Sequence, residues 1–228
     1  MRFICSLALI GSLLSGCGQY SNPNDLTSIP QPDRMEVAYS LLKQATDALD
    51  VKYQKGQITD DQRMEKIREY SEELLQNVDQ SQVPPNDLWQ YAEILRISRK
   101  WVEAEEALLK SIKVPADEDR RIQDTLRLAQ AEAHNGKYKQ ALETARKTFN
   151  AKDEDAAPIL LACLYEIAPV IKGHGVDSEL ADLLKGAIAC HERTKVDEET
   201  SEGKIFVSVR RFHIRKADVY IEQLKAGL

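Results

Sequence analysis

The chain has 228 residues, of which 43% are hydrophobic and 30% are charged, so it can bury a sizeable core. Its 31 Lys and Arg residues against 37 Asp and Glu residues give a net charge of −6, which excludes a general electrostatic attraction to nucleic acid or anionic lipid. Ten glycines and eight prolines, with few β-branched runs, favour a mostly helical chain.

The first residues have the layout of an export signal. Arg2 precedes the uncharged run FICSLALIGSLL at residues 3–14. This run is too short to span a bilayer as a helix, which takes roughly 20 residues, whereas a short apolar run followed by small residues is typical of a cleaved signal. The run leads directly into the sequence LSGC, which ends at Cys17.

LSGC resembles the bacterial lipoprotein box, in which an aliphatic residue and two small residues precede a lipidated cysteine. The resemblance implies a signal peptide at residues 1–16 and a mature chain that is anchored to a membrane by acyl groups on Cys17. An ordinary secretory signal with an incidental cysteine is the alternative. Gly18 and Gln19 replace the Asp that retains such proteins in the inner membrane of enteric bacteria. In a cell that has an outer membrane, this implies that the protein is anchored in that membrane and faces the periplasm.

The segment that follows the cysteine is expected to be a tether. Residues 17–33 contain three prolines and little apolar periodicity, so we expect a flexible link that holds the folded part just off the membrane surface. From residue 34 to the end of the chain, hydrophobic residues recur at helical spacing.

Helical patterns predict a first pair of helices over residues 34–78. Gly56 separates the two, and Thr59 with Gln62 has the spacing of a capping box that starts the second helix. Another pair is expected at residues 155–172 and 177–194, joined by the sequence GHGV.

The C-terminal segment is ambiguous at residues 204–214. The sequence IFVSV has strand propensity, whereas a helix would place a set of residues on one face. We expect this segment to be the terminal helix that covers the open end of the stack. The face that suits this role comprises Val209, Phe212, Lys216, Val219, Tyr220 and Gln223.

Two stretches in the middle of the chain repeat each other with an offset of 37 residues. Aligning Trp101 with Tyr138 also aligns Ala104 with Ala141. Before the turn, Tyr91 and Ala92 align with Leu128 and Ala129. Small residues are expected where the two helices of one copy approach most closely. The positions expected to pack the repeats are Tyr91, Ala92, Trp101 and Ala104 in the first copy and Leu128, Ala129, Tyr138 and Ala141 in the second.

This pattern resembles the tetratricopeptide repeat, two antiparallel helices in about 34 residues. The best copies lie at residues 85–118 and 122–151. The resemblance implies an all-α chain of stacked antiparallel helix hairpins, with about four helix pairs and a C-terminal helix over residues 34–228. The family has a tryptophan at one position of the first helix, and this position is occupied by Leu88 in one copy and Thr125 in the other. The alternative is a plain helical bundle.

No catalytic constellation is present in the sequence, so we expect no enzymatic activity and no cofactor or metal. The histidines lack a metal-binding spacing, and CHER at residues 190–193 is interpreted as a buried Cys190 beside a solvated His191. Cys163 and Cys190 fall on two expected antiparallel helices. They form either a disulfide or two small buried apolar residues.

The repeat resemblance also implies a concave groove lined by the first helix of each pair. We expect a partner segment to bind there. Trp89 either anchors that partner or packs against the preceding helix pair. The groove positions are Trp89, Glu93 and Arg96 in the first copy and Leu126, Gln130 and His134 in the second.

These observations favour a membrane-anchored adaptor in the bacterial cell envelope. It would bind an envelope protein or a peptide segment in the groove and the membrane through lipid on Cys17, without a nucleic-acid partner. One alternative is a lipoprotein with a ligand or metal site near Cys163, His174 and Cys190. Another is a structural lipoprotein that ties envelope layers together.

Overall fold

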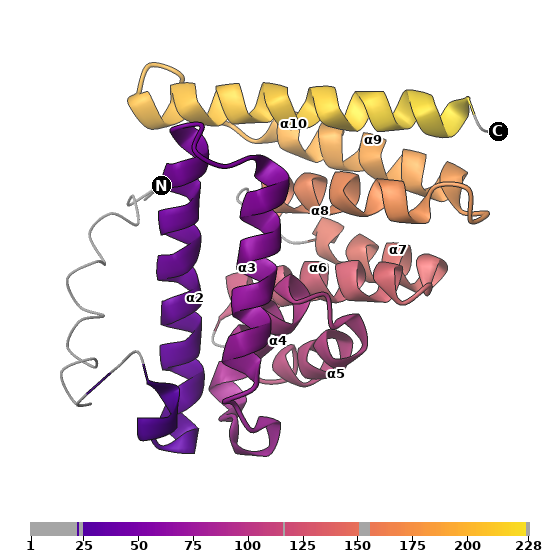
Figure 1. Ribbon diagram of the computed structural model, residues 1–228. Helices are drawn as coiled ribbons and strands as arrows, with labels where there is room; N and C mark the ends of the chain where they lie inside the picture. The colour runs from indigo at the N-terminus through magenta and orange to yellow at the C-terminus, as the bar shows by residue number, and fades with distance from the viewer. Residues whose placement is uncertain (1–21, 23–24, 116, 151–155, 227–228) are drawn as a thin grey trace. The chain divides into compact units, whose positions relative to one another are not determined.

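The computed structural model describes residues 22, 25–115, 117–150 and 156–226 (Figure 1). Every regular element in these ranges is a helix. The chain divides into two compact units, residues 1–110 (unit 1) and 111–228 (unit 2), and each is described by itself. In chain order the described helices form four pairs and a final helix, which confirms the predicted all-α class of helix hairpins.

Unit 1 begins with two long helices. α2 (Gln31–Gln54) and α3 (Asp60–Leu75) pack side by side, and both contact α4 (Leu88–Ile97). Gly56 lies in the left-handed region, with φ of 67°, and the predicted capping box is present. The Gln62 amide donates to Thr59 Oγ1 over 3.2 Å and the Thr59 amide donates to Gln62 Oε1 over 3.0 Å. α5 (Trp101–Ser111) follows α4 and crosses the boundary between the units.

The tether predicted to extend to residue 33 is wrong for its described C-terminal part. Leu26, in the short helix η1 (Leu26–Ser28), and Ile29 are buried. The Arg34 guanidinium donates to the carbonyls of Thr27, Ile29 and Asn77 over 3.0, 2.6 and 3.1 Å. Proline suits the first turn of a helix, and Pro30 and Pro32 lie at the start of α2, so these two prolines mark a helix start and not a flexible segment.

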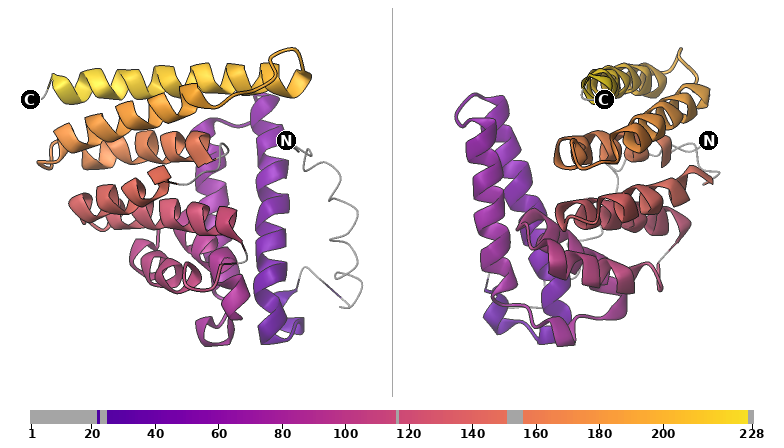
Figure 2. Two further views of the ribbon diagram at one scale, coloured as in Figure 1. Left: turned by 180° about the vertical axis from the view of Figure 1, so that it is seen from behind. Right: turned by 90° about the vertical axis from the view of Figure 1, so that its right-hand side faces the viewer.

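Unit 2 contains two helix hairpins and a terminal helix. α6 (Glu118–His134) pairs with α7 (Tyr138–Arg146), and α8 (Ala156–Ile171) pairs with α9 (Asp177–Arg193). α10 (Ser201–Lys225) packs on both α8 and α9. Because α6 contacts α8 and α8 contacts α10, these three helices form one layer, and α7 and α9 form the other (Figure 2).

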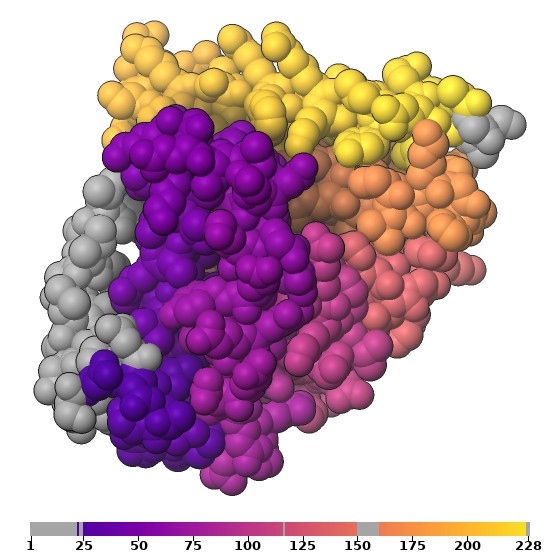
Figure 3. Space-filling model, viewed as in Figure 1, coloured from indigo at the N-terminus to yellow at the C-terminus, as the bar shows by residue number. Residues whose placement is uncertain are grey.

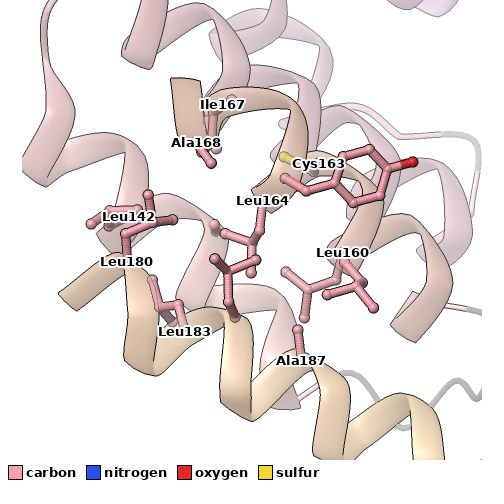
Figure 4. Packing of buried hydrophobic residues seen from close by; sticks show 14 of the residues in the cluster. Leu142, Leu160, Cys163, Leu164, Ile167, Ala168, Leu180, Leu183 and Ala187 are labelled. Atoms are coloured by element: carbon pink, nitrogen blue, oxygen red, sulfur yellow. The ribbon is translucent and has the colours of Figure 1, made fainter. Parts of the chain in front are cut away.

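The core of unit 2 is centred on α8, a helix that is apolar around most of its circumference. Leu161, Leu164 and Ile171 are fully buried, and Figure 4 shows Leu164 among side chains of α8 and α9. Pro169 lies in the last turn and is exposed, and the helix ends at Ile171. The helix thus continues past Pro169 to within one residue of its predicted end at residue 172.

The C-terminal segment is helical, so the ambiguity over residues 204–214 is resolved in favour of a helix. The face predicted to pack on the stack is wrong. The buried residues of α10 are Gly203, Ala217, Ile221 and Leu224, whereas most of the predicted face points to solvent. Both faces of α10 carry apolar residues, so hydrophobic periodicity alone could not choose between them.

Gly203 is expected to resist substitution, although alanine normally favours a helix over glycine. Gly203 is buried in the first turn of α10, where its amide donates to the capping Thr200 Oγ1 over 3.0 Å. A Cβ atom at residue 203 would overlap the backbone carbonyl oxygen of Asp197. We expect Gly203→Ala to lower the free energy of unfolding by about 1–3 kcal/mol, measured by urea denaturation.

Ser208→Ala, on the exposed side of the same helix, is the matched control. It should change the free energy of unfolding by less than about 0.5 kcal/mol. A Gly203→Ala chain as stable as the wild type would contradict the close approach of Asp197 to α10.

Candidate partner-binding surface

The positions predicted to pack the repeats are mostly buried. All four alanines have exposed fractions of 0–1%, which agrees with close helix approach at these points. Trp101 and Tyr138 are the first residues of α5 and α7 and are half-buried. The buried set comprises Tyr91, Ala92, Ala104, Leu128, Ala129 and Ala141.

Tyr138 extends from its own hairpin to the next one. Its ring stacks on the His174 ring with centroids 4.2 Å apart and an interplanar angle of 25°. His174 lies in the turn between α8 and α9, where Gly173 and Gly175 both have positive φ. The Gly173 amide donates to the Asp177 carboxylate over 2.9 Å, which fixes the turn. The aromatic residue after the turn of one hairpin therefore contacts the neighbouring hairpin.

The predicted groove residues of unit 1 lie on α4. Trp89 is half-buried, and its ring makes an edge contact with Tyr39 of α2 at 5.0 Å. Of the two interpretations of Trp89, the structure favours packing against the preceding helix pair. Glu93 and Arg96 form an ion pair with each other over 2.7 Å.

The predicted groove residues of unit 2 have three different environments. Leu126 was wrongly assigned to the groove, because it is buried in the core and its carbonyl accepts a hydrogen bond from the Cys163 thiol over 3.3 Å. Gln130 is also buried, and its side-chain amide donates to Glu166 of α8. His134 is exposed at the end of α6.

A row of polar and aromatic side chains crosses the layer of α6, α8 and α10, and we call it the α6–α8–α10 row. Arg127 donates to Gln130 Oε1 over 3.0 Å and lies 4.0 Å from the Glu166 carboxylate. On the other side of α8, Lys216 Nζ of α10 lies 4.8 Å from the centre of the Tyr165 ring. The row comprises Arg127, Gln130, Tyr165, Glu166 and Lys216.

The electrostatics of the row alternate from helix to helix. Arg127 on α6 is positive, Glu166 on α8 is negative and Lys216 on α10 is positive. Burial raises the pKa of Tyr165, and the Glu166 carboxylate raises it further. Tyr165 therefore stays a neutral hydrogen-bonding group at physiological pH. The row can form hydrogen bonds and ion pairs with a polypeptide but holds no nucleophile beside a general base.

The residues proposed for a ligand or metal site are not brought together. Cys163 is buried beside α6, and His174 is stacked on Tyr138. Cys190 accepts a hydrogen bond from the Arg193 guanidinium over 3.2 Å. Both cysteines are free thiols, so the disulfide alternative for this pair is not formed. Within the described ranges, no three His, Cys, Asp or Glu side chains are placed to hold a metal.

The interpretation of CHER is reversed by the structure. His191 is fully buried, whereas Cys190 is partly exposed. The His191 ring lies 5.3 Å from the Phe206 ring and 6.4 Å from the His213 ring of α10. The signal was present in the sequence, because His191 continues the helical spacing of the buried residues Leu184 and Ala187.

No protein-family model matches the chain, and no curated protein matches it. Among solved structures, it is similar to a variant of a putative kinesin light chain of Podosopora anserina with nearly identical TPR-like repeats. The identity is 17%, the TM-score is 0.44, and the match covers 87% of this chain and 96% of that one. A second structure of the same protein gives 17% identity, a TM-score of 0.40 and coverage of 83% and 95%. The hairpin architecture follows from the helix contacts of this chain itself.

Proposed function

We propose that this chain is a non-enzymatic scaffold that binds an extended partner polypeptide across the α6–α8–α10 row of unit 2, close to a membrane of the bacterial cell envelope. The observation that supports partner binding is the row itself. Three consecutive helices of one layer contribute the partly or fully exposed charged side chains Arg127, Glu166 and Lys216, which are linked through contacts with one another and with the buried Gln130 and Tyr165.

The chemistry of the row suits a polypeptide. An extended segment offers backbone donors and acceptors at regular intervals, together with charged side chains of either sign. Arg127, Glu166 and Lys216 would meet these groups with charges that alternate in sign from helix to helix. The neighbours of these side chains already restrict their rotamers, so binding costs less conformational entropy than it would with free side chains.

The proposal predicts that reversing one charge in the row weakens partner capture. Arg127 lies on α6 with a side chain 37% exposed, so Arg127→Glu should leave the fold intact and place a negative charge beside Glu166. We expect at least tenfold less of any specific envelope protein that the wild-type chain cross-links in cells. Quantitative mass spectrometry of the cross-linked products measures this change.

Arg146→Glu is the matched control, because Arg146 is an exposed arginine at the end of α7, in the opposite layer. It should capture the partner as the wild type does. Equal losses in both variants, or no specific protein captured by the wild-type chain, would exclude the row as the binding surface.

The membrane anchor is a separate part of the proposal, and it depends on Cys17, which lies outside the described residues. Among the described helices, none is both long and apolar enough to cross a bilayer. The lipoprotein-box sequence LSGC supports attachment through acyl chains instead. The same proposal places the anchored chain in the outer membrane, facing the periplasm. This placement is supported by Gly18 and Gln19, which replace the inner-membrane retention Asp.

Mass spectrometry of the mature N-terminus tests the anchor. We expect an acylated Cys17 as the first residue of the wild-type chain and, in Cys17→Ser, an unprocessed chain without lipid. Cys190→Ser is the matched control and should be acylated normally. An unacylated wild-type N-terminus would refute the anchor and leave partner binding to be judged by the Arg127 experiment.

A further inference from the structure

The outer face of α10 carries a regular apolar stripe that nothing in unit 2 covers. Ile205, Val209, Phe212 and Val219 are 65%, 41%, 55% and 55% exposed. α10 packs on α8 and α9 through its other side, and the space-filling view shows the yellow atoms of α10 beside the orange atoms of the preceding helices of unit 2 (Figure 3). The terminal helix of a stack normally presents a polar outer face, whereas an apolar stripe runs between the exposed polar residues of this one.

The spacing of the stripe is that of a helix-pairing seam. Its members alternate steps of four and three residues along α10, which is the period of a helix that packs lengthwise against another helix. The seam spans about 21 Å at 1.5 Å per residue. The stripe comprises Ile205, Val209, Phe212, Lys216 and Val219. Lys216 adds its apolar stem to the seam, while its ammonium group turns towards the Tyr165 and Phe212 rings.

The charges on α10 show which helix fits this seam. Residues 204–211 include the exposed Lys204 and Arg211 and no acidic side chain, whereas residues 217–224 include the exposed Asp218 and Glu222 and no basic one. An antiparallel copy of the same helix therefore brings the basic half of one α10 against the acidic half of the other. A parallel copy would place Arg211 and Lys216 beside their own counterparts and is disfavoured.

We propose that the chain forms a homodimer through antiparallel pairing of α10 with α10 of a second copy. Val209 then faces Val219 of the partner subunit, and Phe212 faces Lys216 of the partner subunit, while Ile205 lies opposite Gln223 of the partner subunit. Residues 204–211 face residues 217–224 in this register. Arg215 meets its counterpart near the two-fold axis, where two long exposed side chains can turn apart in water.

Sedimentation equilibrium of the full chain in density-matched detergent tests the association. We expect a wild-type dimer, with Phe212→Glu raising the dissociation constant at least tenfold and leaving the helix content by circular dichroism unchanged. Val102→Glu is the matched control, because Val102 is an exposed apolar residue, 60% exposed, on α5. It should dimerise as the wild type does. A wild-type chain that stays monomeric up to about 100 μM would overturn the proposal.

Cysteine cross-linking tests the antiparallel register. Cysteines can be bridged only when their Cα atoms lie within about 7 Å. A chain with Val209→Cys and a differently tagged chain with Val219→Cys should form a disulfide-linked heterodimer when mixed, while each alone forms none above the wild-type background. Efficient linking of Val209→Cys to itself would indicate parallel pairing and overturn the proposal. A monomeric chain that requires Phe212 to bind vesicles of anionic phospholipid would equally overturn it, in favour of a lipid surface.

Discussion

Leu164→Ala is expected to lower the free energy of unfolding of unit 2 by about 2–5 kcal/mol. Leu164 is fully buried in α8, the helix that contacts α6, α9 and α10, and Figure 4 shows it among apolar side chains. Removing its isobutyl group forfeits apolar burial and leaves a cavity. Small domains are stable by about 5–15 kcal/mol, so a large share of the stability should disappear. Urea denaturation followed by circular dichroism measures the change.

The same substitution at an exposed leucine separates burial from helix propensity. Leu109 lies on α5 and is 39% exposed, so Leu109→Ala loses much less apolar contact and should cost less than about 1 kcal/mol. If the two variants unfolded at the same urea concentration, the tight packing around α8 would be wrong.

The helix boundaries were the most predictable part of the fold, because local chemistry sets them. Thr59 and Gln62 satisfy each other's backbone amides, so their spacing marks the start of α3 without reference to the rest of the chain. Of the four helix ends predicted at residues 155–172 and 177–194, one agrees with the structure, and each of the other three differs from α8 or α9 by one residue. Glycines with positive φ between these helices, Gly173 and Gly175, account for the agreement.

Contacts between helices were less predictable, because they depend on which face of a helix meets its neighbour. Leu126 was expected in the groove, but α8 packs over it and makes it part of the core. α10 has apolar residues on two faces, and only contact with α8 and α9 determines which face is buried. Glu166 and Lys216 of the candidate row were not predicted for the same reason, since no local signal links α8 to α6 or α10.

The stability of unit 2 is expected to fall as the pH drops from about 6.5 to about 4. His191 is fully buried between α9 and α10, and both of its ring nitrogens lack a hydrogen-bond partner. Burial, together with the positive charge of Arg210 and the neighbouring His213, lowers the pKa of His191 to about 4. Burial and Lys216 also hold the pKa of His213 below its usual value.

The direction of these pKa shifts determines whether acid raises or lowers the stability of the folded state. The unfolded chain takes up the proton near pH 6.5, whereas folded His191 resists it until about pH 4, so acid favours the unfolded state. Each pH unit between these two pKa values changes the free energy of unfolding by about 1.4 kcal/mol, so His191 contributes up to about 3 kcal/mol. This contribution is complete above about pH 6.5 and is lost by about pH 4. Urea denaturation at intervals of half a pH unit from 7.5 to 4 measures the decline.

His191→Leu isolates the contribution of this residue, because leucine fills the apolar site and cannot take up a proton. The free energy of unfolding of the His191→Leu chain should decline less than that of the wild type over the same pH range. The difference between the two declines should reach up to about 3 kcal/mol at pH 4. His174→Leu is the matched control, since His174 is exposed on the turn between α8 and α9 and should leave the slope as in the wild type. If the wild-type and His191→Leu slopes coincided, His191 would have to be charged or hydrogen-bonded in the folded protein, and the packing of α10 on α9 would need revision. If only His191→Leu has the shallower slope, the buried imidazole makes the α9–α10 interface the acid-sensitive part of unit 2.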